Sequence, residues 1–424
     1  MEITYSLRYK KSSFTKNSNI DKEGEIIIYD RGFRIKGKGA GDNGELVSFA
    51  EIKEFYHRDN ELHFITFAKE KYTLLDAGTQ FEQMLTDLYK SRNNFLIDAL
   101  FMKKGRLQYE IDCDFTRVSK FEKPINSGSA TVRFFEKSLV VIPENQDAFA
   151  IHYDFIKLHE FSDFEYTLKF VMDDGLSVTL SRLGNDFELI QEKVNTILGM
   201  LYGDLVNNVF RTAFPTYRAA TLLKLAYKIK NGKTASVKEI RKIDAELVDD
   251  MRKFIVNGEE TSKKIEYLEK MCDEKNLRYG LAKDPVDSGS FVKWTMFAMP
   301  EKNLVAFCVL PRWENANQND DKATAGGEPK IEVFFFKIIM EKGNPMDKFE
   351  EKINEITQSL VVLDFIKDPC YVEKKKLKHS PFQYATRKLP YLRILRRSFL
   401  KKASASDLNE FKKEIDAIID SAAL

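Results

Sequence analysis

The chain of 424 residues has few of the residues that break or cross-link a polypeptide, with 11 Pro, 20 Gly and 4 Cys. So few Pro and Gly residues argue against long flexible linkers. The four cysteines lie far apart and form no CxxC pair, so the sequence predicts neither a disulfide framework nor a cysteine metal site. Buried thiols in a cytoplasmic protein are the expectation for Cys113, Cys272, Cys308 and Cys370.

The sequence also lacks long apolar runs. No stretch approaches the ~20 apolar residues that a membrane-spanning helix needs, and the longest runs, such as the one around residues 334–336, have the length of a strand. The N-terminal segment MEITYSLRYKK alternates in character and has no apolar core, so it does not resemble a signal peptide. We therefore expect no transmembrane segment and a cytoplasmic location.

Residues and motifs typical of catalysis are scarce. Only five His are present, and none belongs to an HExxH motif. The sequence contains no GxxxxGKS/T phosphate-binding loop and no GxSxG nucleophile elbow. Gly37, Gly39 and Gly41 lie between two strand-like segments without a following helix, which favours a hairpin loop over a dinucleotide site. The sequence thus predicts a non-catalytic protein with no metal site and no cofactor.

Apolar and aromatic residues, by contrast, are abundant. Hydrophobic residues make up 43% of the chain, including 33 Phe and 17 Tyr. Disordered chains are poor in such residues, so most of this chain should fold. At roughly 100–200 residues per domain, a chain of this length is expected to form two to four domains.

The first half of the chain contains two copies of one pattern, about 104–106 residues apart. Each copy has a series of short strand-like segments in the same order. In the first copy the segments lie at residues 3–9, 24–30, 33–35, 49–53, 62–67 and 71–75, and in the second at 107–113, 128–135, 139–142, 153–157, 166–170 and 176–180. Agreement in order across the whole unit indicates a duplicated module.

Each copy ends in a segment with the pattern of an amphipathic helix. The helix is predicted to begin at Phe81 in the first copy and at Phe187 in the second, after a turn that contains glycine. Apolar residues step by three and four along both segments, for example at Phe81, Leu85 and Leu88. This spacing places them on one helix face, which is able to seal a sheet.

Short antiparallel strands followed by one C-terminal helix resemble the pleckstrin-homology-like (PH-like) superfold, including the bacterial PH and GRAM groups. The resemblance covers residues 1–203 and rests on element order and length, without a short diagnostic motif. It implies two tandem bent antiparallel sheets, at residues 1–104 and 105–203, each closed by its C-terminal helix. It also implies binding of phosphoinositides, peptides or other proteins, and tandem copies occur in histone-chaperone subunits. A fold alone does not define a function.

The phosphoinositide-binding pattern of that superfold, a Lys followed after a variable loop by basic-x-Arg, is not satisfied in either copy. In the first copy, Glu25, Ile26 and Ile27 stand where basic residues are needed, and in the second copy only Arg133 fits. We therefore predict ordinary solvated loop positions for the nearby cations, which are Lys10, Lys11 and Lys16 in the first copy and Arg117, Lys120 and Lys123 in the second.

The second half completes a predicted α+β fold with three further segments. Residues 204–276 have helical periodicity, with a capping-box pattern at Ser236 and Glu239, and are interpreted as a helical linker region. Residues 277–366 combine strand-like runs with a helical segment and are interpreted as a small α+β domain, or alternatively as a divergent third copy of the repeat. Residues 367–424 are interpreted as a basic helical C-terminal segment.

Positive charge is concentrated near the C-terminus. Residues 370–402 contain eleven Lys and Arg and one acid, whereas the rest of the chain carries a net charge of about −8. After Pro390 the segment is predicted to form a helix with Leu392, Leu395 and Phe399 on one side. The candidate contacts for an anionic partner are Lys374, Lys375, Lys376, Lys378, Arg387, Lys388, Arg393, Arg396, Arg397, Lys401 and Lys402.

Three functions fit these observations. The first is a non-catalytic binding or scaffold protein that uses tandem PH-like domains to dock a protein or an anionic partner. The second is a peripheral membrane protein that contacts anionic lipid through residues 387–402, because basic amphipathic helices suit such surfaces. The third is a nucleic-acid or chromatin-associated factor. An alternative role for the same cations is packing on an acidic face of this chain or of a second copy.

Overall fold

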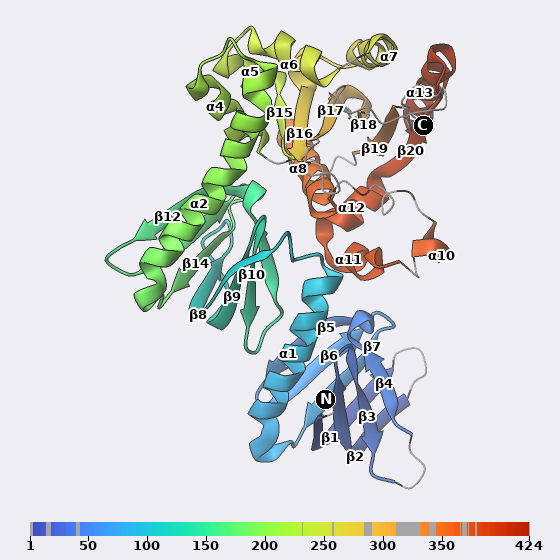
Figure 1. The fold of residues 1–424 in the computed structure, drawn as a ribbon. Coiled ribbons are helices and arrows are strands. Elements are labelled where there is room, and N and C mark those ends of the chain that lie inside the picture. Colours follow the sequence, from blue (N-terminus) through green and yellow to red (C-terminus); the bar gives the residue numbers. More distant parts are fainter. Residues whose placement is uncertain are drawn as a thin grey trace, which may run out of the picture. The chain divides into compact units, whose positions relative to one another are not determined.

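The computed structural model contains two compact units, Met1–Val194 and Asn195–Leu424. Both units combine antiparallel sheets with helices (Figure 1), which confirms the predicted α+β class. The structure describes residues 3–13, 18–39, 43–230, 232–256, 258–283, 291–310, 331–338, 345–364, 366, 371, 373–377 and 380–423.

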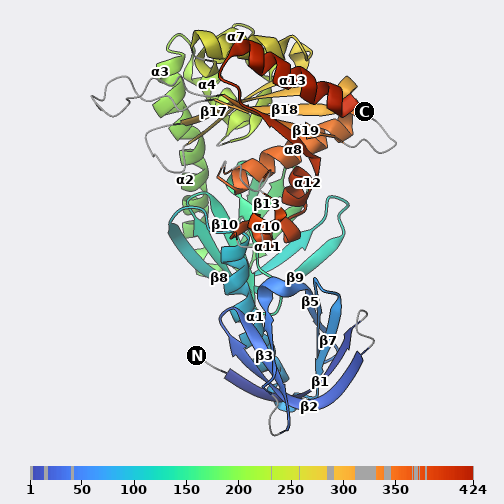
Figure 2. The same ribbon diagram turned by 90° about the vertical axis from the view of Figure 1, so that its right-hand side faces the viewer.

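The first unit begins with a curled seven-stranded antiparallel sheet, against which one helix packs (Figure 2). The strand order is β4-β3-β2-β1-β7-β6-β5. The elements of this first copy are β1 (Ile3–Ser13), β2 (Ser18–Tyr29), β3 (Gly32–Gly37), β4 (Glu45–Ser48), β5 (Ile52–Arg58), β6 (Glu61–Thr66), β7 (Glu70–Leu75) and α1 (Phe81–Ala99).

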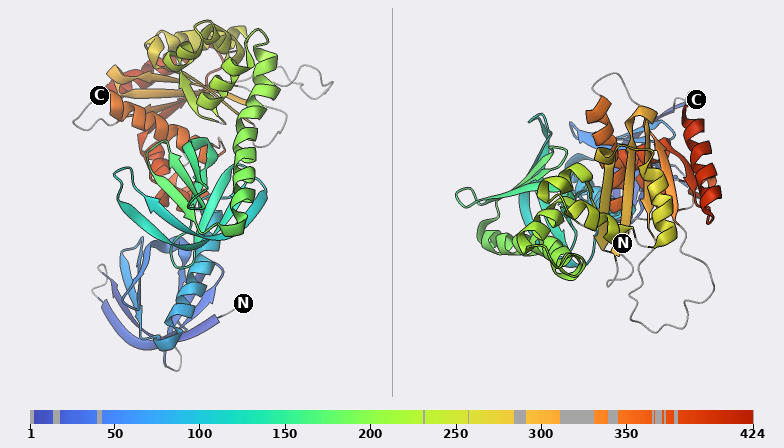
Figure 3. Two further views of the ribbon diagram at one scale, coloured as in Figure 1. Left: turned by 90° about the vertical axis from the view of Figure 1, so that its left-hand side faces the viewer. Right: turned by 90° about the horizontal axis from the view of Figure 1, so that it is seen from above.

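The second copy repeats this arrangement with the strand order β11-β10-β9-β8-β14-β13-β12. Its sheet is drawn in green to cyan in Figure 3. The elements are β8 (Leu107–Val118), β9 (Pro124–Phe135), β10 (Ser138–Pro143), β11 (Phe149–His152), β12 (Ile156–Ser162), β13 (Thr167–Met172), β14 (Ser177–Ser181) and α2 (Phe187–Leu205). Two tandem bent sheets, each followed by its helix, confirm the predicted architecture of this half.

The two-residue period of the strands decides which side chains enter each sheet's core. In β1, Tyr5, Leu7 and Tyr9 are buried, and the residues between them are exposed. This alternation is that of a strand with one buried face. Continued along the strands, it places Lys11 of β1 and Arg117 of β8 on the inner face, at the end of the curl.

Polar side chains of α1 connect the two copies. Arg92 is fully buried, and its Nε and Nη2 atoms donate to the Asp147 carboxylate at 2.6 and 2.7 Å. The side-chain amide of Asn93 forms hydrogen bonds with three backbone groups, those of Pro143 at the end of β10 and of Gln146 and Ala148 in the β10–β11 loop. Because directional buried hydrogen bonds specify one arrangement, these contacts join the two sheets into one body.

The second unit is built on a six-stranded antiparallel sheet of order β15-β16-β17-β18-β19-β20. Its strands are β15 (Thr234–Ser236), β16 (Leu277–Lys283), β17 (Phe291–Met299), β18 (Leu304–Val309), β19 (Glu332–Lys337) and β20 (Phe399–Ala403). Its helices include α3 (Arg211–Ala213), α4 (Ala219–Ile229), α5 (Val237–Ile243), α6 (Leu247–Ile255), α7 (Glu259–Glu269), α8 (Pro345–Val362), α10 (Lys374–Leu377), α11 (Phe382–Lys388), α12 (Pro390–Ser398) and α13 (Leu408–Ala423).

Helices cover both faces of this sheet. Phe335 packs in a core with residues of α4 to α7 and α13, whereas its neighbour Phe334 packs in a second core with residues of α8 and α12. Consecutive strand residues point to opposite faces, so a strand between two helical layers is buried on both sides. This explains why β17 reads as an almost continuous apolar run with nearly every residue buried.

Strands of this sheet come from all three segments predicted for the second half. β15 lies within residues 204–276, β20 lies within 367–424, and the other four strands lie within 277–366. The domain boundaries themselves stay predictions. The simple strand order of this sheet differs from the order in both N-terminal copies, in which the first strand pairs with the seventh.

Several local predictions have a clear outcome. The capping box at Ser236 and Glu239 is present at the start of α5, and the helical segment predicted within residues 277–366 is α8. Gly41, the last glycine of the predicted hairpin loop, lies outside the described residues. Among the helices that the structure describes, none combines the length and the apolar character needed to cross a bilayer.

The basic helix predicted after Pro390 is shorter than expected. Helix α12 ends at Ser398, and the residues that follow form β20, which pairs with β19. The prediction that Phe399 shares a helical face with Leu395 is therefore wrong. Its ring instead lies beside Phe336, with 5.9 Å between the ring centroids. An open sheet edge supplies backbone partners for these residues, and helical periodicity does not contain that information.

Candidate functional site

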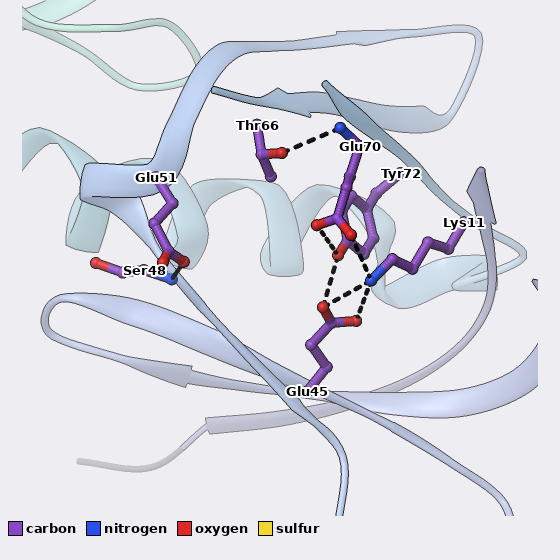
Figure 4. A network of polar contacts seen from close by, with 7 residues as sticks. All are labelled: Lys11, Glu45, Ser48, Glu51, Thr66, Glu70 and Tyr72. Atoms are coloured by element: carbon purple, nitrogen blue, oxygen red, sulfur yellow. Dashed lines mark hydrogen bonds and ion pairs between the residues drawn. The ribbon is translucent and has the colours of Figure 1, made fainter. Parts of the chain in front are cut away.

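A polar cluster lies at the end of the first sheet, between β1, β4 and β7 (Figure 4). Lys11 on β1 lies directly opposite Tyr72 on β7. Its Nζ donates to the two Glu45 carboxylate oxygens at 2.7 and 2.8 Å and lies 3.2 Å from Glu70 Oε1. The Tyr72 hydroxyl donates to Glu45 at 2.9 Å and to Glu70 at 3.3 Å. One cation is thus shared by two carboxylates of the same sheet.

The charge of Lys11 is satisfied inside the protein. Burial alone lowers the pKa of Lys11, but the Glu45 and Glu70 carboxylates outweigh this effect, and the pKa is raised. Burial and the same two carboxylates raise the pKa of Tyr72. An external anion would have to compete with both carboxylates for this lysine.

Short-range hydrogen bonds hold the residues of this cluster in place (Figure 4). Ser48 and Glu51 form a reciprocal capping box just after β4. Thr66 Oγ1 accepts a hydrogen bond of 3.1 Å from the Glu70 amide. These contacts secure the end of β4 and the start of β7, which carry Glu45 and Glu70.

Arg117 takes the position of Lys11 in the second copy. Arg117 on β8 lies directly opposite Val178 on β14, as Lys11 lies opposite Tyr72. The strand beyond continues the same register in both copies. The two cations are therefore structurally equivalent, although their neighbours differ.

The carboxylates that satisfy the lysine are replaced by apolar residues around the arginine. Glu45 is the first residue of β4, and Phe149 is the first residue of the corresponding β11. Glu70 is the first residue of β7, and Leu176 directly precedes the corresponding β14. With Val178 in place of the tyrosine, all three polar partners of the first copy are absent from the second.

Arg117 consequently has a polar group without a partner. Its guanidinium carbon lies 4.8 Å from the centroid of the Phe149 ring. Its Nε atom is buried and has no hydrogen-bond acceptor among the described residues. Burial lowers the pKa of Arg117, and the negative charge of Asp174 offsets this only in part. Since an arginine stays charged in proteins and a buried unpaired donor is costly, the group favours an incoming anion.

A second unsatisfied group lies across the strand pair from Arg117. Asn126 on β9 is paired with Arg117, and its Nδ2 donates to Gln146 Oε1 at 2.7 Å. Its Oδ1 atom is buried without a donor in the described part of the chain. Lys120 and Lys123 of the adjoining turn are exposed. A cationic donor beside a free acceptor suits an anion that also carries a proton, such as hydrogen phosphate.

The prediction that Lys10, Lys11 and Arg117 lie in loops is wrong, because all three lie in strands, and Lys11 and Arg117 are also largely or partly buried. Lys16 lies outside the described residues. Lys120 and Lys123 are exposed as predicted. The signal that marks Arg117 is the two-residue alternation that runs through the buried Phe115 before it. Periodicity identifies Arg117 as a residue of the inner sheet face. That the second copy lacks the carboxylates of the first is seen only when the two folded copies are compared.

The basic C-terminal residues are distributed over several elements. Lys375 and Lys376 lie on α10, Arg387 and Lys388 on α11, Arg393, Arg396 and Arg397 on α12, and Lys401 and Lys402 on β20. Lys378 lies outside the described residues, and the side chain of Lys374 is not among those described. Lys402 Nζ donates to Glu332 Oε1 at 2.7 Å, so this cation contacts an acid of the same chain. A shared role for the others stays a prediction.

The apolar face of α12 is occupied by the protein itself. Leu392 and Leu395 are each 1% exposed, and Leu395 belongs to the core beneath the sheet. The prediction that these two residues share one side of the helix is consistent with this packing. An amphipathic helix inserts into a lipid surface through its apolar face, and here that face is already covered.

Metal ligands do not gather in the part of the chain that the structure describes, where no group of three His, Cys, Asp or Glu side chains is arranged to hold an ion.

Fold and sites define an α+β protein with tandem curled sheets. No family model matches the chain, and no curated protein matches it at a significant level.

One solved structure, titled "Structure of the Spt16D Pob3N heterodimer", is similar to part of the chain. The similarity covers 41% of this chain and 86% of that one, at 12% identity and a TM-score of 0.16. A likeness at this score carries no argument about function, so a functional assignment has to come from the geometry of the residues.

Proposed function

We propose that this chain is a non-catalytic binding protein in which the two PH-like sheets form one docking module, and in which Arg117 receives an anionic group of a protein partner. The contrast between the two copies carries the proposal. At one position of one scaffold, Lys11 is neutralised by two carboxylates, whereas Arg117 faces apolar residues and keeps a buried Nε without an acceptor. A buried charged donor costs stability unless it forms a hydrogen bond or an ion pair with a partner group.

The join between the copies supports a docking role. Arg92 and Asn93 link α1 to the β10–β11 loop, and that loop leads directly into Phe149. A surface that is already ordered loses little conformational entropy on binding. The stacked Phe149 ring likewise holds the guanidinium in one orientation.

The chemistry of the two sheet ends supports binding rather than catalysis. General acid–base catalysis needs a group that exchanges a proton near neutral pH. Lys11 and Tyr72 have raised pKa values because of their carboxylate partners, and Arg117 stays protonated. These groups hold charge in place and do not transfer it.

A protein partner is favoured over a lipid surface for the chain as a whole. The segment most suited to lipid by sequence, α12, has its apolar residues Leu392 and Leu395 buried, and Leu395 belongs to a core of the second unit. Contact with a bilayer through that face would require the helix to leave the core.

Calorimetric titration of the full chain with inorganic phosphate tests the Arg117 site. We expect saturable binding by the wild type and at least tenfold weaker binding by R117Q, because the cationic donor is lost. Arg106 provides a matched control, since it lies in the same copy and its side chain is 91% exposed, so R106Q should bind like the wild type. The phosphate affinity of R117K should lie between those of the wild type and R117Q, because lysine keeps the charge without the planar guanidinium.

Three results would overturn the proposal. Equal phosphate binding by R117Q and the wild type, or no binding by either, removes the anion site. Sedimentation with vesicles tests whether the site binds lipid instead. The wild type would then bind vesicles that contain phosphatidylinositol phosphate but not vesicles of phosphatidylcholine, and R117Q would lose this binding.

A further inference from the structure

The hairpin between β12 and β13 of the second copy differs from its counterpart in the first copy. Strand pairing closes at Ser162 and Thr167, which leaves the four turn residues 163–166. In the first copy, Arg58 pairs with Glu61, which leaves only two turn residues. The second copy has therefore gained two residues at this turn.

The longer turn carries two exposed aromatic residues. The side chain of Phe164 is 93% exposed and that of Tyr166 is 53% exposed. The turn of the first copy consists of Asp59 and Asn60, which are both polar and adopt the left-handed backbone that such short turns need. Exposed aromatic surface is unfavourable in water, and clusters of it mark interaction sites on soluble proteins.

The aromatic rings stand on a buried platform. Phe187, the first residue of α2, is 3% exposed. The rings of Tyr166 and Phe161 meet it edge-on, at centroid distances of 5.5 and 6.1 Å and interplanar angles of 85° and 81°. Edge-to-face contact is a preferred geometry for aromatic pairs. Tyr166 is therefore held in place before any partner arrives.

Acidic residues accompany the rings. The exposed acids of the hairpin and the adjoining start of α2 are Glu160, Asp163, Glu165, Asp186 and Glu188, and the exposed cations of the two strands are Lys157 and Lys169. Asp186 accepts a hydrogen bond from the Tyr109 hydroxyl at 2.9 Å. None of the other four acids forms an ion pair among the described residues. Their charges remain available to a partner of opposite sign.

We propose that this aromatic–acidic patch, formed by Phe161, Phe164, Tyr166, Asp163, Glu165 and Glu188, docks a protein segment rich in arginine or lysine. The exposed ring faces attract guanidinium and ammonium groups and cover their apolar stems. The carboxylates pair with the same cations and speed the encounter. Anionic lipid and nucleic acid are disfavoured, because the surrounding charge has the same sign as theirs.

The patch extends the docking role proposed for the tandem module but does not depend on Arg117. The two sites require partners of opposite charge, since Arg117 is a cationic donor and the patch is acidic. Their failures are therefore distinguishable in one set of variants.

Fluorescence polarisation with a labelled deca-arginine peptide tests the patch in the full chain. We expect saturable binding that weakens at least tenfold in F164S/Y166S, which removes the rings but no charge. D163N/E165Q should also weaken binding and reduce its dependence on salt. Tyr56 of the first copy is 48% exposed and serves as the matched control, so Y56S should bind within twofold of the wild type.

Three outcomes would overturn the patch. One is the absence of binding. Another is weaker binding by the charge variant together with unchanged binding by F164S/Y166S, which would indicate unspecific electrostatic attraction. The third is binding to phosphatidylserine vesicles that disappears in F164S/Y166S, which would indicate a membrane contact. Thermal unfolding of each variant checks the fold, and Y166F, which keeps the ring, should retain affinity.

Discussion

The two N-terminal copies share strand order, register and a closing helix, yet they treat their polar groups in opposite ways. The first copy satisfies its inner cation with Glu45 and Glu70, whereas the second leaves Arg117 Nε buried without an acceptor. A duplicated scaffold needs its core and its strand pairing to fold. At the ends of the curl, the second copy has Phe149 and Leu176 where the first has its two carboxylates, so Arg117 lacks those acceptors.

The same contrast holds at the β5–β6 and β12–β13 hairpins. The first copy closes its hairpin with a short polar turn, and Arg58 at its edge pairs with Asp59 at 2.9 Å. The second copy presents Phe164 and Tyr166 at a longer turn. Both proposals place docking in the second copy and give the first a supporting role.

The join between the copies should have the largest effect on stability. Asp147→Ala leaves the Arg92 guanidinium buried without its carboxylate, and we expect the free energy of unfolding to fall by about 3 kcal/mol. Denaturant unfolding followed by two probes measures this change, and a single transition should separate into two. Asp163→Ala, at an exposed acid, is the control and should leave the curve unchanged. Unaltered stability of D147A would contradict a rigid tandem module.

Tyr72→Phe, in the polar cluster of the first copy, should lower the free energy of unfolding. Loss of hydroxyl bonds to two carboxylates should cost about 2 kcal/mol at pH 7. In the wild type the pKa of this tyrosine is raised by folding, so the unfolded chain ionises first as the pH passes ~10 and stability falls. The difference between wild type and Y72F should therefore narrow by about 1.4 kcal/mol between pH 9 and pH 11. A constant difference would contradict a buried, carboxylate-bound hydroxyl.

Phe149→Glu should give the second copy a carboxylate at the position where the first copy has Glu45. A carboxylate at this position pairs with Arg117, and we expect phosphate affinity to fall at least tenfold, or about 1.4 kcal/mol. The titration is the one used for R117Q. Phe149→Leu, which adds no charge, should keep the site open. Undiminished phosphate binding by F149E would show that the missing carboxylate is not what distinguishes the copies.

The smallest effect is expected at the turn before β7. Thr66→Val removes the acceptor of the Glu70 amide, and we expect a loss of about 0.7 kcal/mol in denaturant unfolding. The corresponding residue of the second copy is the apolar Met172, where Met172→Leu should change little. A larger loss in M172L than in T66V would contradict the view that only the first copy uses polar side chains at its rim.

Much of the fold could be predicted from sequence patterns. The repeat, the helices that begin at Phe81 and Phe187 and the capping box at Ser236 all follow from periodicity and local chemistry, which act within a few residues. The strand at Phe399 could not be predicted, because an open edge of β19 decided it. The surroundings of Arg117 could not be predicted either, because its neighbours come from distant strands. A shared role for the basic C-terminal residues stays a prediction.

The sequence by itself determined that one sheet-and-helix module occurs twice, because apolar periodicity and turn residues are local properties. Only the tertiary structure decided which cation is satisfied. Lys11 is 34 residues from Glu45 and 59 from Glu70 along the chain, and the curl of the sheet brings them together. The availability of a charge depends on such distant neighbours, so it is a property of the folded chain.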